Sequence, residues 1–157
     1  MIQINKKILS LCSLIVFIFN CQEDKSIDVF SYQINNKSEK IEILVRYLEK
    51  KSGLIDAEYH IWYKDNSAGL ISGPSDYTIY LALKIKPDSL DSWVKTLEPT
   101  TKVISTDLWN ELKLDKNVWK LESKPEVFLS KSNKEVKLVY RKECLILGIY
   151  STLPIRY

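Results

Sequence analysis

Two neighbouring stretches of alternating side chains constrain the fold of this chain more than any other feature. Residues 55–64 read IDAEYHIWYK, and residues 77–86 read YTIYLALKIK. Side chains of a strand point alternately to its two faces, so alternation of apolar and polar residues is typical of half-buried strands. The connection between the stretches, DNSAGLISGPSD, is rich in residues that favour turns. We therefore expect an antiparallel strand pair at the centre of the fold.

The alternation assigns the side chains of this strand pair to two faces. One face, expected to meet the core, carries Ala57, Tyr59, Ile61, Tyr77, Ile79, Leu81 and Leu83. The opposite face carries His60, Trp62 and Tyr80, rimmed by Glu58, Lys64 and Lys84. If this second face is open, its aromatic side chains form a patch suited to bind a protein, a glycan or a membrane. The alternative is that the C-terminal segment or a loop covers them and creates a second small core.

Three further segments have helical patterns. Ile41, Leu44, Val45 and Leu48 recur at helical spacing after a cap at Asn36 or Ser38, and Gly53 is expected to end that helix. PDSLDSWVKTLE, residues 87–98, combines a capping Asp88 with an apolar stripe and is closed by Pro99. STDLWNELKL, residues 105–114, predicts a short helix capped by Ser105 or Thr106.

The remaining segments have strand patterns. IDVFSYQI, residues 27–34, alternates and predicts a first strand. EVFLSK and EVKLVYRK are joined by the turn residues SNK and predict a hairpin near the C-terminus. CLILGIY, residues 144–150, is apolar throughout, as expected for a strand buried on both faces. Together these elements predict an α+β fold: an antiparallel sheet of about five or six strands with two or three helices packed on one face.

The N-terminus has the composition of a secretory signal peptide. Lys6 and Lys7 are the only charges before Cys21, and the apolar run from Ile8 to Phe19 is interrupted only by Ser10, Cys12 and Ser13. This run of about a dozen residues is shorter than the roughly twenty needed to span a bilayer. A basic start, a short apolar segment and a polar exit favour a leader over a permanent anchor. A membrane anchor that is never removed is the alternative.

The end of this leader resembles that of a bacterial lipoprotein precursor. Ile18 stands three positions before Cys21, as the aliphatic residue of such precursors does, whereas Phe19 and Asn20 depart from their preference for small residues. The resemblance implies cleavage before Cys21 and lipidation of its thiol, which anchors the protein to a membrane of the bacterial envelope, on its periplasmic or surface side. Each buried methylene contributes about 0.8 kcal/mol, so several acyl chains together hold a protein firmly.

We expect three regions from these patterns. Residues 1–20 form a lipoprotein-type signal peptide, residues 21–26 a lipidated cysteine and short tether, and residues 27–157 a single α+β domain. Loss of Lys6 and Lys7 with the leader leaves 21 basic against 20 acidic side chains. Because the domain is nearly neutral and shows no basic stripe, we do not expect it to bind nucleic acid.

Few residues offer catalytic or metal-binding chemistry. His60 is the only histidine, and Cys144 is the only cysteine that remains free once Cys12 is removed and Cys21 is lipidated. A structural zinc needs several nitrogen or sulfur ligands, so we expect no metal and no cofactor. Cys144 lies among apolar neighbours, where a thiol behaves as a small hydrophobic group. We therefore assign no catalytic residue, and we take His60, Trp62 and Tyr80 as candidate ligand-binding residues.

These observations leave three hypotheses for the function. The first is an envelope lipoprotein whose domain binds a partner, an envelope protein or a glycan, without catalysis. The second is a small hydrolase or transferase of the envelope, which requires His60 or Cys144 beside an acid or a hydroxyl in a cleft. The third is an anchored inhibitor or immunity protein, which is a specialised binder.

Overall fold

The computed structural model of this chain describes residues 25–67, 73–102 and 107–155. The predicted signal peptide, Cys21 and the predicted caps Ser105 and Thr106 lie outside these ranges. Within them, no helix has both the length and the hydropathy required to cross a membrane.

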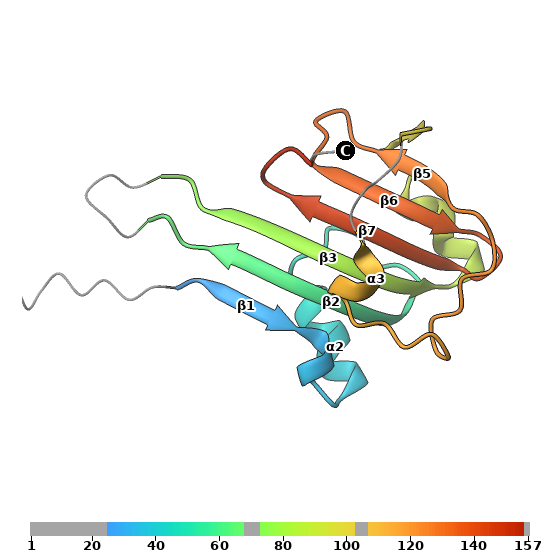
Figure 1. Cartoon of the computed structure of the whole chain (residues 1–157), viewed down its shortest axis with the longest axis horizontal. Coiled ribbons are helices and arrows are strands. Elements are labelled where there is room, and N and C mark those ends of the chain that lie inside the picture. The colour runs from blue at the N-terminus through green and yellow to red at the C-terminus, as the bar shows by residue number, and fades with distance from the viewer. Residues whose placement is uncertain (1–24, 68–72, 103–106, 156–157) are drawn as a thin grey trace, which may run out of the picture.

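Seven strands form one open antiparallel sheet (Figure 1). In chain order the strands are β1 (Ile27–Phe30), β2 (Leu54–Lys64), β3 (Asp76–Ile85), β4 (Glu98–Thr100), β5 (Glu126–Leu129), β6 (Glu135–Tyr140) and β7 (Leu145–Ser151). Their spatial order is β1-β2-β3-β7-β6-β5-β4, so the C-terminal strand lies at the centre. The sheet is larger than the five or six strands predicted, and the described part of the chain is mostly β structure.

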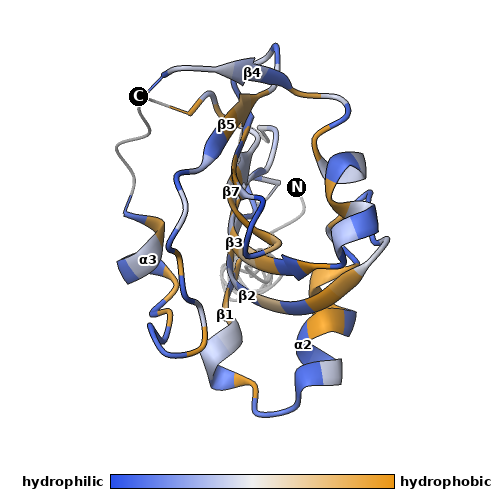
Figure 2. Ribbon diagram, turned by 90° about the vertical axis from the view of Figure 1, so that its right-hand side faces the viewer, coloured by the Kyte–Doolittle hydropathy of each residue, from blue (hydrophilic) through white to orange (hydrophobic). Residues whose placement is uncertain are grey.

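The helices are few and short. They are α2 (Lys37–Leu44), α3 (Leu108–Glu111) and two 3-10 helices, η1 (Ser31–Gln33) and η2 (Pro87–Trp93). Figure 2 shows α2 on one side of the sheet and α3 on the other, so the expectation that helices cover one face is wrong. The physical reason is that both faces of the central strands are apolar, and each apolar face needs a covering layer.

The two faces accordingly hold two separate hydrophobic clusters. On the first face, Leu44 of α2 and Leu90, Trp93 and Val94 of the η2 region pack against alternate side chains of β2, β3, β6 and β7. On the second face, Leu108 and Leu112 pack with Leu114 and Trp119 against the other set of strand side chains. Ile146 and Leu147 are successive buried residues of β7 that belong to opposite clusters. This arrangement confirms that β7 is buried on both sides.

The structure confirms that the two central strands pair and that the predicted side chains of each face the core. β2 and β3 are antiparallel neighbours, with Tyr59 opposite Leu81 and His60 opposite Tyr80. The side chains assigned to the core face do enter the first cluster, where Ala57, Tyr59, Ile61, Ile79 and Leu83 are buried. The predicted C-terminal hairpin of β5 and β6 is also present, with Phe128 opposite Lys137.

The first strand is shorter than the alternation of residues 27–34 predicts. It ends at Phe30 because Ser31 turns inward, where its hydroxyl donates to Glu58 at 2.5 Å and accepts from the backbone N–H of Tyr59 at 2.8 Å. The serine side chain thus replaces the next ladder bond, and the chain continues as η1.

The two longer predicted helices also differ from the expectation. Asn36 is the cap of α2, accepting from the backbone N–H groups of Ser38 and Glu39, but the α-helix ends at Leu44 rather than near Gly53. Residues 87–98 form η2 and a turn instead of an α-helix, and Glu98 begins β4. Pro99 lies in that edge strand beside β5, a position where the missing N–H is tolerated. The short third helix α3 is present, and Asp107 caps it.

Candidate functional site

A glycine in the central strand lies at the edge of a cavity on the first face of the sheet. Gly148 of β7 lies between Leu81 of β3 and Lys137 of β6 in one cross-strand row. A Cβ atom at Gly148 would lie 2.9 Å from the carbonyl oxygen of Val136 and 3.1 Å from Cδ1 of Leu81. The close approach of the neighbouring strand and of the Leu81 side chain therefore requires glycine here.

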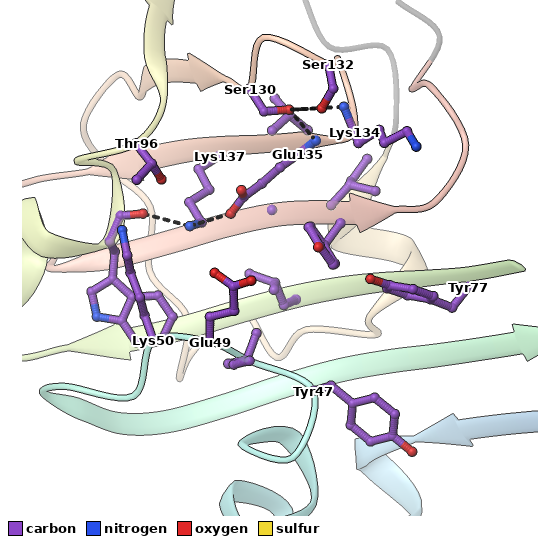
Figure 3. Close-up of a pocket in the computed structure, with 17 residues that line it drawn as sticks. Tyr47, Glu49, Lys50, Tyr77, Thr96, Ser130, Ser132, Lys134, Glu135 and Lys137 are labelled. Carbon is purple, nitrogen blue, oxygen red and sulfur yellow. Dashed lines mark hydrogen bonds and ion pairs between the residues drawn. The ribbon is translucent and has the colours of Figure 1, made fainter.

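Gly148 is one of the residues that line a cavity of about 420 Å³. Its floor is formed by β3, β6 and β7, and its walls by the segment that follows α2, the segment that follows η2 and the β5–β6 turn (Figure 3). The lining is polar and apolar in about equal parts, and its hydrogen-bonding side chains include Glu49, Lys50, Tyr77, Thr96, Ser130, Ser132, Glu135, Lys137 and Tyr150. A pocket of this size with aromatic and convergent polar groups is suited to a small ligand.

Lys137 and Glu135 form a buried ion pair at the base of the pocket. The Lys137 ammonium donates to Oε1 of Glu135 at 2.6 Å and to the carbonyl oxygen of Trp93 at 2.7 Å. The Lys137 side chain is only 9% exposed. Burial lowers the pKa of Lys137, and the carboxylate of Glu135 opposes that shift. The pair thus compensates its own charges and ties β6 to the end of η2.

Glu49 and Lys50 present two further charges from the segment that follows α2. Lys50 donates through Nζ to the carbonyl oxygen of Ser92 at 2.7 Å, a neutral partner. Its positive charge is close enough to Lys137 to contribute to the lowered pKa of that group. Glu49 lies beside Lys50, and its carboxylate points into the pocket on the side of Glu135 and Lys137 (Figure 3). The negative charge of Glu49 contributes to raising the pKa of Tyr77.

Two tyrosines close the opposite end of the pocket. The rings of Tyr77 and Tyr150 are tilted against each other with centroids 5.5 Å apart. Burial, followed by a hydrogen bond with Tyr150, raises the pKa of Tyr77. The Tyr77 hydroxyl therefore remains protonated at neutral pH and can donate or accept hydrogen bonds. This end of the pocket offers aromatic surface together with neutral polar groups.

The predicted ligand-binding residues lie on the other face of the sheet. His60 and Tyr80 are brought together, with ring centroids 5.8 Å apart, and Trp62 follows on the same face. His60 is 9% exposed, because α3 covers it and Phe30 stacks on it, whereas Trp62 is 38% exposed. Tyr80 packs against the second hydrophobic cluster. Of the three, only Trp62 is exposed, so together they do not form an open aromatic patch.

His60 is held between two carboxylates. Nδ1 lies 2.6 Å from Oε1 of Glu111 in α3, and Nε2 lies 2.7 Å from Oδ1 of Asp28 in β1. Carboxylates only accept hydrogen bonds, so a ring nitrogen that carries a proton donates to the carboxylate it faces. With both nitrogens occupied, the histidine links β1 to α3. It lies across the sheet from the pocket.

The free thiol of Cys144 lies in the turn between β6 and β7. It donates to the carbonyl oxygen of Arg141 at 3.6 Å, and its backbone has a φ of 53°. Neither His60 nor Cys144 lines the pocket. In the described part of the chain, no three His, Cys, Asp or Glu side chains are placed to bind a metal together.

The sequence contained a signal for the pocket that the predicted site did not use. In EVKLVY, Glu135 and Lys137 occupy the same alternating positions as Val139, so two charges lie on a core-facing side. Glycine also interrupts the otherwise apolar run of β7. Charges at inward positions beside a glycine in the neighbouring strand indicate a polar hollow, but only once the strand order is known.

Comparison with known proteins gives no match: no family model, no curated protein and no solved structure is significantly similar to this chain.

Proposed function

We propose that this protein is a lipid-anchored protein of the bacterial envelope whose domain binds a small ligand without transforming it. The observation that carries the binding role is the polar and aromatic pocket over Gly148. Its buried ion pair is internally compensated, and the histidine and the free thiol lie outside it. The anchoring role rests on the leader sequence that ends at Cys21.

The anchor is tested by lipid labelling of the full-length chain in a bacterial host. We expect an alkyne-tagged fatty acid to label the wild-type protein and Cys12→Ala equally, because Cys12 leaves with the leader. Cys21→Ala should carry no label and should leave the membrane fraction. A labelled Cys21→Ala protein would contradict the assignment.

The binding role is tested by blocking the pocket. Thr96 is exposed and lines the pocket, whereas Thr101 is exposed and does not. We expect Thr96→Trp to abolish binding of small molecules from envelope extracts, measured by ligand-observed NMR, and Thr101→Trp to preserve it. Binding that both variants retain would contradict a ligand site in this pocket.

A further inference from the structure

Two charges that face the pocket lack a partner of opposite sign. Among the described residues, the carboxylate of Glu49 has neither an ion-pair nor a hydrogen-bond partner. The ammonium of Lys50 is bonded only to the carbonyl oxygen of Ser92, which leaves its net charge uncompensated. These residues are adjacent in sequence, but no ion pair joins them. The pocket therefore offers one free negative and one free positive charge from the same wall.

The other charges of the lining do not alter this balance. Glu135 and Lys137 neutralise each other at 2.6 Å. Glu49 and Lys134 are both exposed, but Figure 3 shows the Glu49 carboxylate within the pocket and the Lys134 side chain directed away from Lys137. A charged group that leaves water for a pocket needs a partner of opposite sign. A ligand with a single charge would satisfy only one of the two groups.

We propose that the pocket binds a small zwitterion, an amino acid or a short peptide with free ends, with its carboxylate on Lys50 and its ammonium on Glu49. This inference rests on the proposed binding function and specifies its ligand. Leu81, Trp93 and Tyr150 supply an apolar and aromatic surface for a side chain of the ligand. The cavity has room for a body larger than the charged groups alone.

The test compares ligands that differ by one charge. The probes are L-phenylalanine, L-alanyl-L-phenylalanine, N-acetyl-L-phenylalanine, which lacks the ammonium, and L-phenylalanine amide, which lacks the carboxylate. Binding to the full-length protein in detergent is measured by isothermal titration calorimetry. We expect a zwitterion to bind and each blocked derivative to bind about tenfold more weakly. A tenfold change in affinity corresponds to about 1.4 kcal/mol of binding free energy. Comparing the affinities of phenylalanine and the dipeptide shows whether the pocket prefers a free amino acid or a short peptide.

Variants assign each charge to its partner. Lys50→Met should remove the preference for phenylalanine over its amide, and Glu49→Gln should remove the preference over the N-acetyl form. Lys51→Met is the matched control, because Lys51 is exposed and does not line the pocket, and it should retain both preferences. Urea unfolding midpoints would confirm that each variant is folded.

Two results would overturn the inference. One is equal binding of the zwitterion and its blocked derivatives. The other is an absence of binding by all four probes; if envelope ligands are then still lost in Thr96→Trp, the binding function stands and only the zwitterion is wrong. If no ligand shows dependence on the pocket, the proposed function fails as well.

Discussion

Single residues show how this fold accommodates charge beneath its surface. Replacing Glu135 with Gln would leave the ammonium of Lys137 buried without its carboxylate. Because an unpaired buried charge is costly, we expect Glu135→Gln to reduce the free energy of unfolding by about 1–3 kcal/mol. Urea denaturation followed by circular dichroism measures this loss.

Lys137→Met is the informative companion to that variant. Methionine keeps most of the apolar stem of the side chain and removes the desolvated ammonium, so the expected loss is smaller than for Glu135→Gln. Equal losses in the two variants would mean that the ion pair itself, rather than the cost of an unpaired ammonium, stabilises this site.

The hydrogen bonds of Glu143 predict that the stability of the fold decreases in acid. Its carboxylate accepts hydrogen bonds from the Ser123 hydroxyl at 2.5 Å and from the backbone N–H groups of Ser123 and Glu122 at 2.7 Å and 3.0 Å. The Ser123 hydroxyl is the largest cause of the lowered pKa of Glu143. The folded pKa lies below the unfolded one, so the stabilisation is complete above the unfolded value and disappears as pH falls through the folded value.

We therefore expect Glu143→Gln to have a lower thermal midpoint than the wild type at pH 7. The difference between the two midpoints should be smaller at pH 3. Glu122→Gln is the control, because Glu122 is exposed and contributes only its backbone N–H to this contact. A gap between Glu143→Gln and the wild type that stays the same at both pH values would contradict the assigned pKa shift.

Sequence patterns predicted individual residues best where their chemistry is local. Asn36 was one of two predicted caps and fills that role with bonds to residues two and three positions ahead. Glu49, Lys50 and Lys137 were missed, because each is an ordinary charged residue in its own segment. Lys50 and Lys137 take their place in the pocket through bonds to residues 40 or more positions away, Ser92 and Trp93 respectively.

Among the elements, β7 depends most on one residue. Gly148→Ala would place a Cβ 2.9 Å from the carbonyl oxygen of Val136 in the adjacent strand. The strands would have to separate, so we expect a loss of about 1–3 kcal/mol in the free energy of unfolding. Gly73→Ala is the matched control, since its Cβ would meet only the Cβ of Asn66 at 3.9 Å. Equal effects of the two substitutions would disprove the close approach.

Elements were predicted reliably where one periodicity dominated. Clear alternation identified β2 and β3, and continuous apolar character identified β7. The segment 87–98 was wrongly predicted to be an α-helix because its caps and apolar stripe suit one. In the structure, Lys50 and Lys137 donate to the carbonyl oxygens of Ser92 and Trp93. These tertiary bonds satisfy acceptors that an α-helix would use internally, and Glu98 then pairs with β5.

For the whole molecule, the C-terminal strand is decisive because it lies between β3 and β6. A chain that ends at Cys144 would lose β7, divide the sheet and uncover both hydrophobic clusters. We expect that chain to be unfolded by near-ultraviolet circular dichroism. A chain that ends at Leu153 keeps β7 and the bond from the Thr152 N–H to Tyr77, and should fold with lower stability because the Ile155 contact is lost. Native-like spectra for the shorter chain would disprove the central role of β7.

Local sequence patterns were sufficient to show which residues alternate, which side of β2 and β3 enters a core, and that the apolar run 144–150 contains a strand buried on both sides. These follow from the side-chain periodicity of a strand, which needs no partner to be visible. The tertiary structure decided that helices cover both faces, and that Gly148, Lys137 and Lys50 meet in one pocket. Strand order and cross-sheet contacts bring together residues far apart in the chain, such as Lys50 and Gly148, and no local pattern records them.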